Sequence, residues 1–101
     1  MATFIILGNW TEKGARDFAD APARARANEA AVTAMGGKLI GTWWTLGSYD
    51  FVSILEAPDD ATVTAGLLVL GAGGNVRTVT MRAFGLSEME AIVSAAKSAG
   101  G

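Results

Sequence analysis

The chain has 101 residues, half of them hydrophobic, which is the length of one domain with a modest core. Its net charge is −2 and its pI about 4.9, so it offers no basic surface for phosphates and a nucleic-acid partner is not expected. Cysteine and histidine are absent, which excludes disulfides, thiolate nucleophiles, and zinc or haem held by these residues.

The N-terminal third predicts a strand, a short helical turn and a long helix. Residues 2–8 carry large apolar side chains at odd and even positions, as in a central strand that is covered on both faces. Thr11 can cap the short turn that follows. The Asp-Ala-Pro sequence at residues 20–22 predicts the start of a helix that runs to about Met35, and Gly36 provides its left-handed exit.

The middle of the chain predicts a β-hairpin. Residues 38–46 and 49–57 are rich in aromatic and β-branched side chains, and only Gly47 and Ser48 separate them. A connection of this length joins antiparallel neighbours. Adjacent Trp43 and Trp44 fall on opposite faces of such a strand.

A second helix is predicted after the hairpin. Asp59 or Asp60 caps its start, and it ends in the glycine-rich residues 71–74. A phosphate-binding loop has the opposite order, because its glycines leave a strand and open a helix. Glu56 and the two aspartates resemble a carboxylate metal cluster, but acidic residues gather at helix starts for capping alone, so no metal is expected.

The last part predicts a fourth strand and a short terminal helix. Residues 75–84 form the strand. Ser87 and Glu90 match a capping box, which predicts a helix that ends near Lys97.

This element order predicts an α+β fold of the ferredoxin-like βαββαβ type with an added C-terminal helix, in a single domain over residues 1–101. Four strands form an antiparallel sheet, and the crossovers place both main helices on one face. Residues 2–8, 39–46 and 51–55 are apolar on both faces, so the other face needs a second subunit, a ligand, or both. A homodimer or larger homo-oligomer is therefore expected.

Several short motifs resemble the GYD-domain family. Together they extend from Phe4 to about Met89, with Ser48 as a small departure from the family pattern. The matching stretches are residues 47–52 (Gly-Ser-Tyr-Asp-Phe-Val), 56–60 (Glu-Ala-Pro-Asp-Asp), 74–78 (Gly-Asn-Val-Arg-Thr), 82–84 (Arg-Ala-Phe) with Glu88, and 22–25 (Pro-Ala-Arg-Ala). The resemblance implies the dimeric α/β-barrel arrangement, in which two ferredoxin-like units pack sheet against sheet, and it implies no catalytic role.

Polar residues near the predicted hairpin have two open interpretations. Tyr49 and Asp50 form either a packed tyrosine with a turn aspartate, or a phenol and a carboxylate at the rim of a pocket. Asn9 and Trp10, at the end of the first strand, are candidates for the same pocket. Three arginines either bind an anion or pair with Asp50 or Glu56: Arg24, Arg77 and Arg82. Arg77 and Arg82 fall on opposite faces of the sheet, because one is at an odd and the other at an even position of the same strand. One of Trp43 and Trp44 packs beneath the helices, and the other lines an interface or a pocket.

Three classes of function fit these features. We favour a non-catalytic oligomeric domain that binds a small apolar or aromatic ligand, or a protein, where the sheets meet. The second class is a cofactor-independent enzyme, such as a monooxygenase or isomerase, with a dry aromatic cavity and Tyr49 or Asp50 as base. The third is a structural building block of a larger assembly. We expect no cofactor, no membrane partner and a cytoplasmic location, since the short apolar run at the N-terminus has no basic flank.

Overall fold

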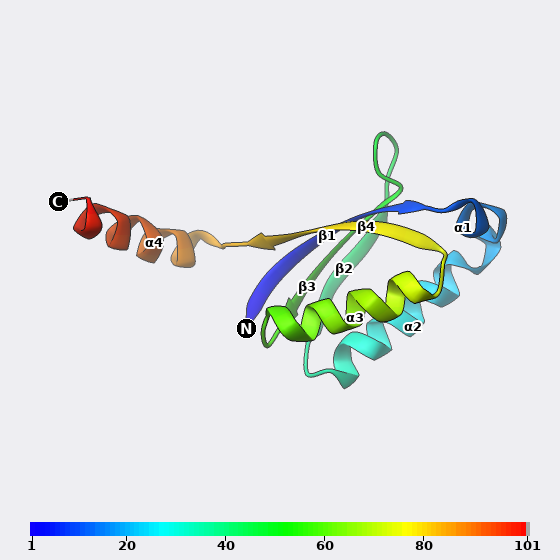
Figure 1. Ribbon diagram of the computed structural model, residues 1–101, viewed down its shortest axis with the longest axis horizontal. Helices are drawn as coiled ribbons and strands as arrows, with labels where there is room; N and C mark the ends of the chain where they lie inside the picture. The colour runs from blue at the N-terminus through cyan, green and yellow to red at the C-terminus, as the bar shows by residue number, and fades with distance from the viewer. Residues whose placement is uncertain (101) are drawn as a thin grey trace.

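The computed structural model describes residues 1–100 and has the predicted α+β, ferredoxin-like architecture (Figure 1). The C-terminal limit of the predicted domain, residue 101, lies outside the described residues. Four antiparallel strands form one sheet in the order β2-β3-β1-β4. They are β1 (Ala2–Trp10), β2 (Lys38–Trp44), β3 (Phe51–Ala57) and β4 (Val76–Ala83). The helices are α1 (Glu12–Arg16), a 3₁₀ turn (Phe18–Asp20), α2 (Ala21–Ala34), α3 (Asp60–Ala72) and α4 (Leu86–Ala99).

One face of the sheet is covered by helices, as predicted. Helices α2 and α3 both lie on this side (Figure 1). The buried core is the set of apolar side chains between them and the central strands: Phe4, Ile6, Leu55, Ala57 and Val63. A core of five buried residues is small for a domain of this length, so the chain leaves much apolar surface uncovered.

The other face of the sheet is equally apolar. Ile5 of β1 lies between Ile54 of β3 and Met81 of β4. Two residues further along β1, Leu7 lies between Val52 and Val79. The expectation of two apolar faces is therefore confirmed, and no helix among residues 1–100 packs on this second face (Figure 1).

Most helix ends follow local capping chemistry. The Thr11 hydroxyl accepts the amide of Gly14 at 3.2 Å, and the Asp59 carboxylate accepts the amide of Thr62 at 2.8 Å, as predicted. Gly36, at φ 82°, provides the left-handed exit of α2. The Asp20 side chain makes no capping hydrogen bond, so the expected side-chain cap of α2 is wrong.

The predicted two-residue turn between β2 and β3 is also wrong. The connection comprises residues 45–50, since β2 ends at Trp44 and β3 begins at Phe51. Hydrogen bonding between the two segments continues one step past the strand ends, because the Thr45 amide donates to the Asp50 carbonyl at 2.9 Å. Asp50 is also bonded to β1, where its amide donates to the Gly8 carbonyl at 2.8 Å. Strand β2 also carries a register shift between Leu39 and Gly41, which the sequence pattern did not predict.

Helix α4 is longer than predicted and begins earlier. Its N-cap is Gly85 rather than Ser87, and the Glu88 carboxylate accepts the Gly85 amide at 3.2 Å. The helix has 14 residues, as many as α2. It extends away from the sheet and helices and is the reason for the longest molecular dimension of 55 Å (Figure 1).

Candidate interaction surfaces

The uncovered sheet face has an apolar centre between two polar ends. We call this surface the open face. Its exposed apolar residues include Trp43 and Val79 on the two edge strands, whose exposed fractions are 50% and 52%. At one end Asn9 pairs with Arg77, and at the other end Lys38 pairs with Glu56, across neighbouring strands. An apolar centre within a polar rim is the usual anatomy of a protein–protein interface.

Local packing fixes the position of Trp43 on the open face. A Cβ atom built on Gly41 would lie 2.6 Å from the Trp43 ring, so the indole lies over this glycine. Only a residue without a side chain leaves that space. Interfaces are enriched in tryptophan, because a large rigid ring buries much area at low entropic cost.

Helix α4 forms a second unpartnered apolar surface. Leu86, Met89, Ile92 and Val93 follow helical spacing and define one stripe along it. All four side chains are exposed, and Leu86 is 80% exposed. An amphipathic helix without a covering element is stabilised in proteins by packing against a partner.

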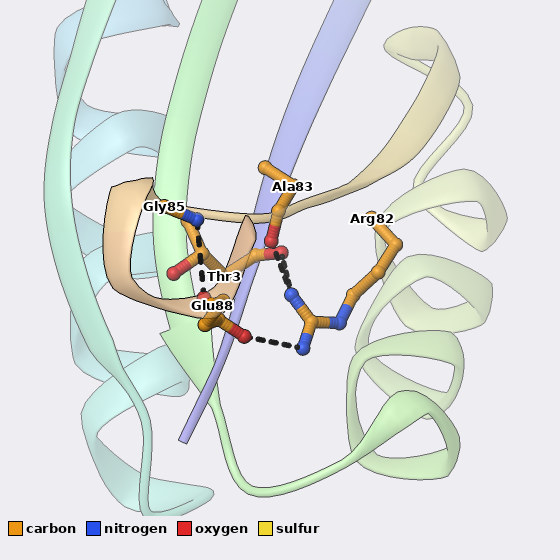
Figure 2. A network of polar contacts seen from close by, with 5 residues as sticks. All are labelled: Thr3, Arg82, Ala83, Gly85 and Glu88. Carbon is orange, nitrogen blue, oxygen red and sulfur yellow. Dashed lines mark hydrogen bonds and ion pairs between the residues drawn. The ribbon is translucent and has the colours of Figure 1, made fainter. Parts of the chain in front are cut away.

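A polar network fixes the first turn of α4 to the end of the sheet (Figure 2). The Arg82 guanidinium donates to the Thr3 carbonyl at 3.3 Å, to the Ala83 carbonyl, and to the Glu88 carboxylate at 3.2 Å. The same guanidinium lies 4.5 Å from the centre of the Phe84 ring. Arg82 therefore pairs with α4, and not with Asp50 or Glu56 as we expected.

The carboxyl group of Glu88 is held in its charged form by this network. The hydrogen bond from the Gly85 amide lowers the pKa of Glu88 below its ordinary value, and the bond from Arg82 lowers the pKa further. The Glu88 carboxylate thus bonds both the first turn of α4 and Arg82 of β4.

A cavity of about 320 Å³ lies between α2, α3 and the covered face of the sheet. Its lining includes Trp44 from β2 and Arg24 from α2, and the Arg24 guanidinium donates to the Asp17 carbonyl at 3.1 Å. Small residues of α2, such as Ala25 and Ala31, also line it, which leaves the space open. This cavity is on the opposite side of the sheet from the expected ligand site.

The predicted site residues separate into four groups. Asn9, Trp43 and Arg77 lie on the open face, whereas Trp10, Arg24 and Trp44 line the cavity. Tyr49 and Asp50 lie in the β2–β3 connection, and Arg82 is at the base of α4. The structure therefore confirms that Trp43 and Trp44 face opposite ways, and it does not bring all nine residues into one site.

The carboxylate of Asp50 has a structural role. It accepts the backbone amide of Trp10 at 2.9 Å, and so joins the β2–β3 connection to the end of β1. Tyr49 contributes its carbonyl to the same connection, by accepting the Thr45 hydroxyl at 2.6 Å. Neither Tyr49 nor Asp50 lines the cavity.

Two general features of the described chain belong to this picture. Among residues 1–100, no group of three or more acidic side chains lies close enough together to hold a metal ion. None of the helices described has both the length and the apolar character needed to cross a membrane.

Comparison with known proteins identifies the family. A family model described as GYD domain matches residues 4–93. The chain belongs to the GYD domain family.

A named protein and a solved structure, both from Thermus thermophilus, are similar to this GYD domain. One, named glutamine synthetase and cystathionine beta-lyase binding protein, is 35% identical over 90 residues, which are 88% of this chain and 95% of the relative. The other is the crystal structure of TTHA0845, at 26% identity and a TM-score of 0.49, covering 84% of this chain and 95% of that one.

Sequence reasoning missed the exposed stripe of this GYD domain on α4. The signal was present, since residues 86, 89 and 93 have helical spacing, but the helix was predicted to be short and its apolar residues were given no role. The family match ends at residue 93, within this helix.

Proposed function

We propose that this GYD domain is a non-catalytic, homodimeric protein-binding domain, located in the cytoplasm, whose single domain covers residues 1–101. The observation that carries the proposal is the open face, which places an apolar centre and a polar rim on the surface of a small domain. Its partners are a second copy of itself and an enzyme.

The second copy covers the open face. Two such faces are identical and self-complementary about a two-fold axis, which is the commonest symmetry of soluble homo-oligomers. Sheets that pack face to face bring their inner side chains into one layer about 10 Å thick. Val79 and Met81 on the edge strand, together with Trp43 on the opposite edge, then lose their exposure to water.

The enzyme partner is suggested by the Thermus relative, whose name states that it binds glutamine synthetase and cystathionine beta-lyase. We propose that this chain binds one or both of these enzymes. The surfaces left free by a sheet-to-sheet dimer include the β2–β3 connection, where Leu46 is fully exposed, and the outer side of α3, where Leu68 is exposed. Exposed leucines on a connection and a helix are suited to docking on another protein.

A small ligand and catalysis receive less support. A ligand between two open faces stays a prediction, which thermal-shift screening of the dimer against aromatic metabolites would check. The enzyme alternative required Tyr49 or Asp50 in a water-poor cavity, whereas Asp50 is engaged by the Trp10 amide and neither residue lines the cavity.

The test is direct binding between purified proteins. We expect the chain to bind immobilised glutamine synthetase or cystathionine beta-lyase from its own organism in biolayer interferometry, and not to bind an unrelated enzyme of similar acidity. Leu46→Asp should weaken binding about tenfold or more, as expected when a charge enters a buried apolar contact. A matched control, Ser94→Asp on α4, adds the same charge at an exposed position away from both of these surfaces. Absence of binding to both enzymes would refute the proposed partner.

A further inference from the structure

Helix α4 and the cavity are two apolar surfaces of one chain that do not meet each other. We propose that α4 of one copy occupies the groove over the cavity, between α2 and α3, of a second copy, so that two chains exchange their C-terminal helices. This exchange goes beyond the proposed function, because it concerns the helix side of the sheet and leaves the open face free.

The chain does not deliver α4 to its own groove. Only Phe84 and Gly85 separate β4 from α4, and a chain spans at most about 3.6 Å per residue. Arg82 and Glu88 hold the first turn of the helix in the direction that leads away from the body (Figures 1 and 2). Folding back would break this network, whereas a second copy can meet α4 where it already points.

The groove has the character of a surface that is covered in the assembly. Helix α3 carries one charged residue, Asp60, among 13, and a helix that is apolar all round is normally buried. Val69 lines the cavity and is nevertheless 75% exposed. Helix α2 presents alanines to the same space, so the two helices together form an apolar channel without filling it.

Length and charge favour α4 as the occupant. Both α2 and α4 have 14 residues, or about 21 Å of helix. Among the described residues that line the cavity, Arg24 alone is charged. Glu90 lies one turn from both Leu86 and Val93, at the border of the apolar stripe, where it can meet Arg24 of the second copy.

This pairing sets the direction of the docked helix. Glu90 is the fifth residue of α4 and Arg24 the fourth of α2, so a parallel arrangement overlaps the two helices along their whole length. An antiparallel arrangement with the same pair would leave residues 94–99, six of the 14 residues of α4, beyond the start of α2. The parallel arrangement places Ala96 beside Ala31, which lines the cavity.

The absence of cysteine from the chain allows a clean cross-linking test. Two single variants, Ala31→Cys and Ala96→Cys, are mixed and oxidised, so that a disulfide between position 31 and position 96 joins two chains and never one. We expect a mixed disulfide dimer on a non-reducing gel. The control is Ser94→Cys mixed with Ala31→Cys, because Ser94 is on the opposite side of α4 and should give at least fivefold less product.

A charge reversal adds a second readout. Arg24→Glu should reduce the cross-link at least fivefold, and Glu90→Arg in the Ala96→Cys chain should restore it. The proposal would be overturned if no mixed dimer formed, or if positions 94 and 96 gave equal yields. It would also be overturned if another protein or a small molecule occupied the groove while α4 stayed reactive. Enzyme binding is measured separately, so either proposal can fail alone.

Discussion

At the scale of single residues, Glu88 joins more parts of the molecule than its half-buried position suggests. It accepts the Gly85 amide as the first turn of α4 forms, and it binds the guanidinium of Arg82 at the end of β4. Arg82 in turn reaches the Thr3 carbonyl of β1 (Figure 2). The Arg82–Glu88 pair therefore connects the start of a helix to two strands.

Protonation of Glu88 should loosen α4. Because the pKa of Glu88 is lowered in the folded chain, its contribution to stability is present above the ordinary value of 4.5 and is lost as the pH falls through the lowered pKa. We expect the protection of the first-turn amides of α4 from hydrogen exchange, measured relative to the intrinsic exchange rate at each pH, to decrease below about pH 4.5. In Glu88→Gln the turn should exchange faster already at neutral pH, with a weaker pH dependence.

Glu29→Gln is the matched control, since Glu29 lies on the exposed surface of α2. This substitution should leave the exchange of α4 unchanged at every pH. An unchanged α4 in Glu88→Gln would contradict the role assigned to the network.

At the scale of elements, the sheet was more predictable than its connections. The alternation of side chains along β1 and β3 depends on backbone geometry alone, so the two apolar faces follow from the residue order. The hairpin turn was mispredicted because Gly47 and Ser48 look like a local turn, whereas Asp50 bonds to β1, which is about 40 positions away in the chain. Local patterns carry no information about such a distant partner.

The start of α4 shows the same limit. Two pairs of residues three positions apart fit the pattern of a helix start: Gly85 with Glu88, and Ser87 with Glu90. Serine is preferred over glycine as an N-cap residue. Arg82 decides between them, because it binds Glu88 and so favours the earlier pair. The residues of the interaction surfaces were therefore partly predictable. The faces of Trp43 and Arg77 follow from the alternation of side chains along a strand, whereas the apolar stripe on α4 was not predicted.

The β2–β3 connection should depend on Asp50. Asp50→Ala removes the acceptor of the Trp10 amide, and we expect a loss of about 1–3 kcal/mol in the free energy of unfolding. Asp50→Asn keeps an acceptor oxygen and should lose less. Urea unfolding of the two variants measures the difference, and hydrogen exchange at the Trp10 amide locates it. Equal stability of Asp50→Ala and the parent chain would contradict this anchoring role.

At the scale of the whole molecule, the small buried core implies that association contributes to stability. We expect light scattering to give at least twice the chain mass of 10.4 kDa, and a thermal midpoint that rises with protein concentration. Val79→Asp, on the edge strand β4 of the open face, should weaken the concentration dependence. Thr64→Asp on α3 is the control. A parent chain that stays monomeric with a constant midpoint would contradict sheet pairing.

The irregularity in β2 has a consequence for unwanted assembly. Strands β2 and β4 are the two edges of the sheet, and an unpaired edge can template the addition of strands from other molecules. The shift between Leu39 and Gly41 breaks the regular spacing of amides along one edge, while β4 keeps a regular edge of eight residues. End-to-end growth into fibres needs two compatible edges on every molecule, so this bulge favours closed particles over filaments.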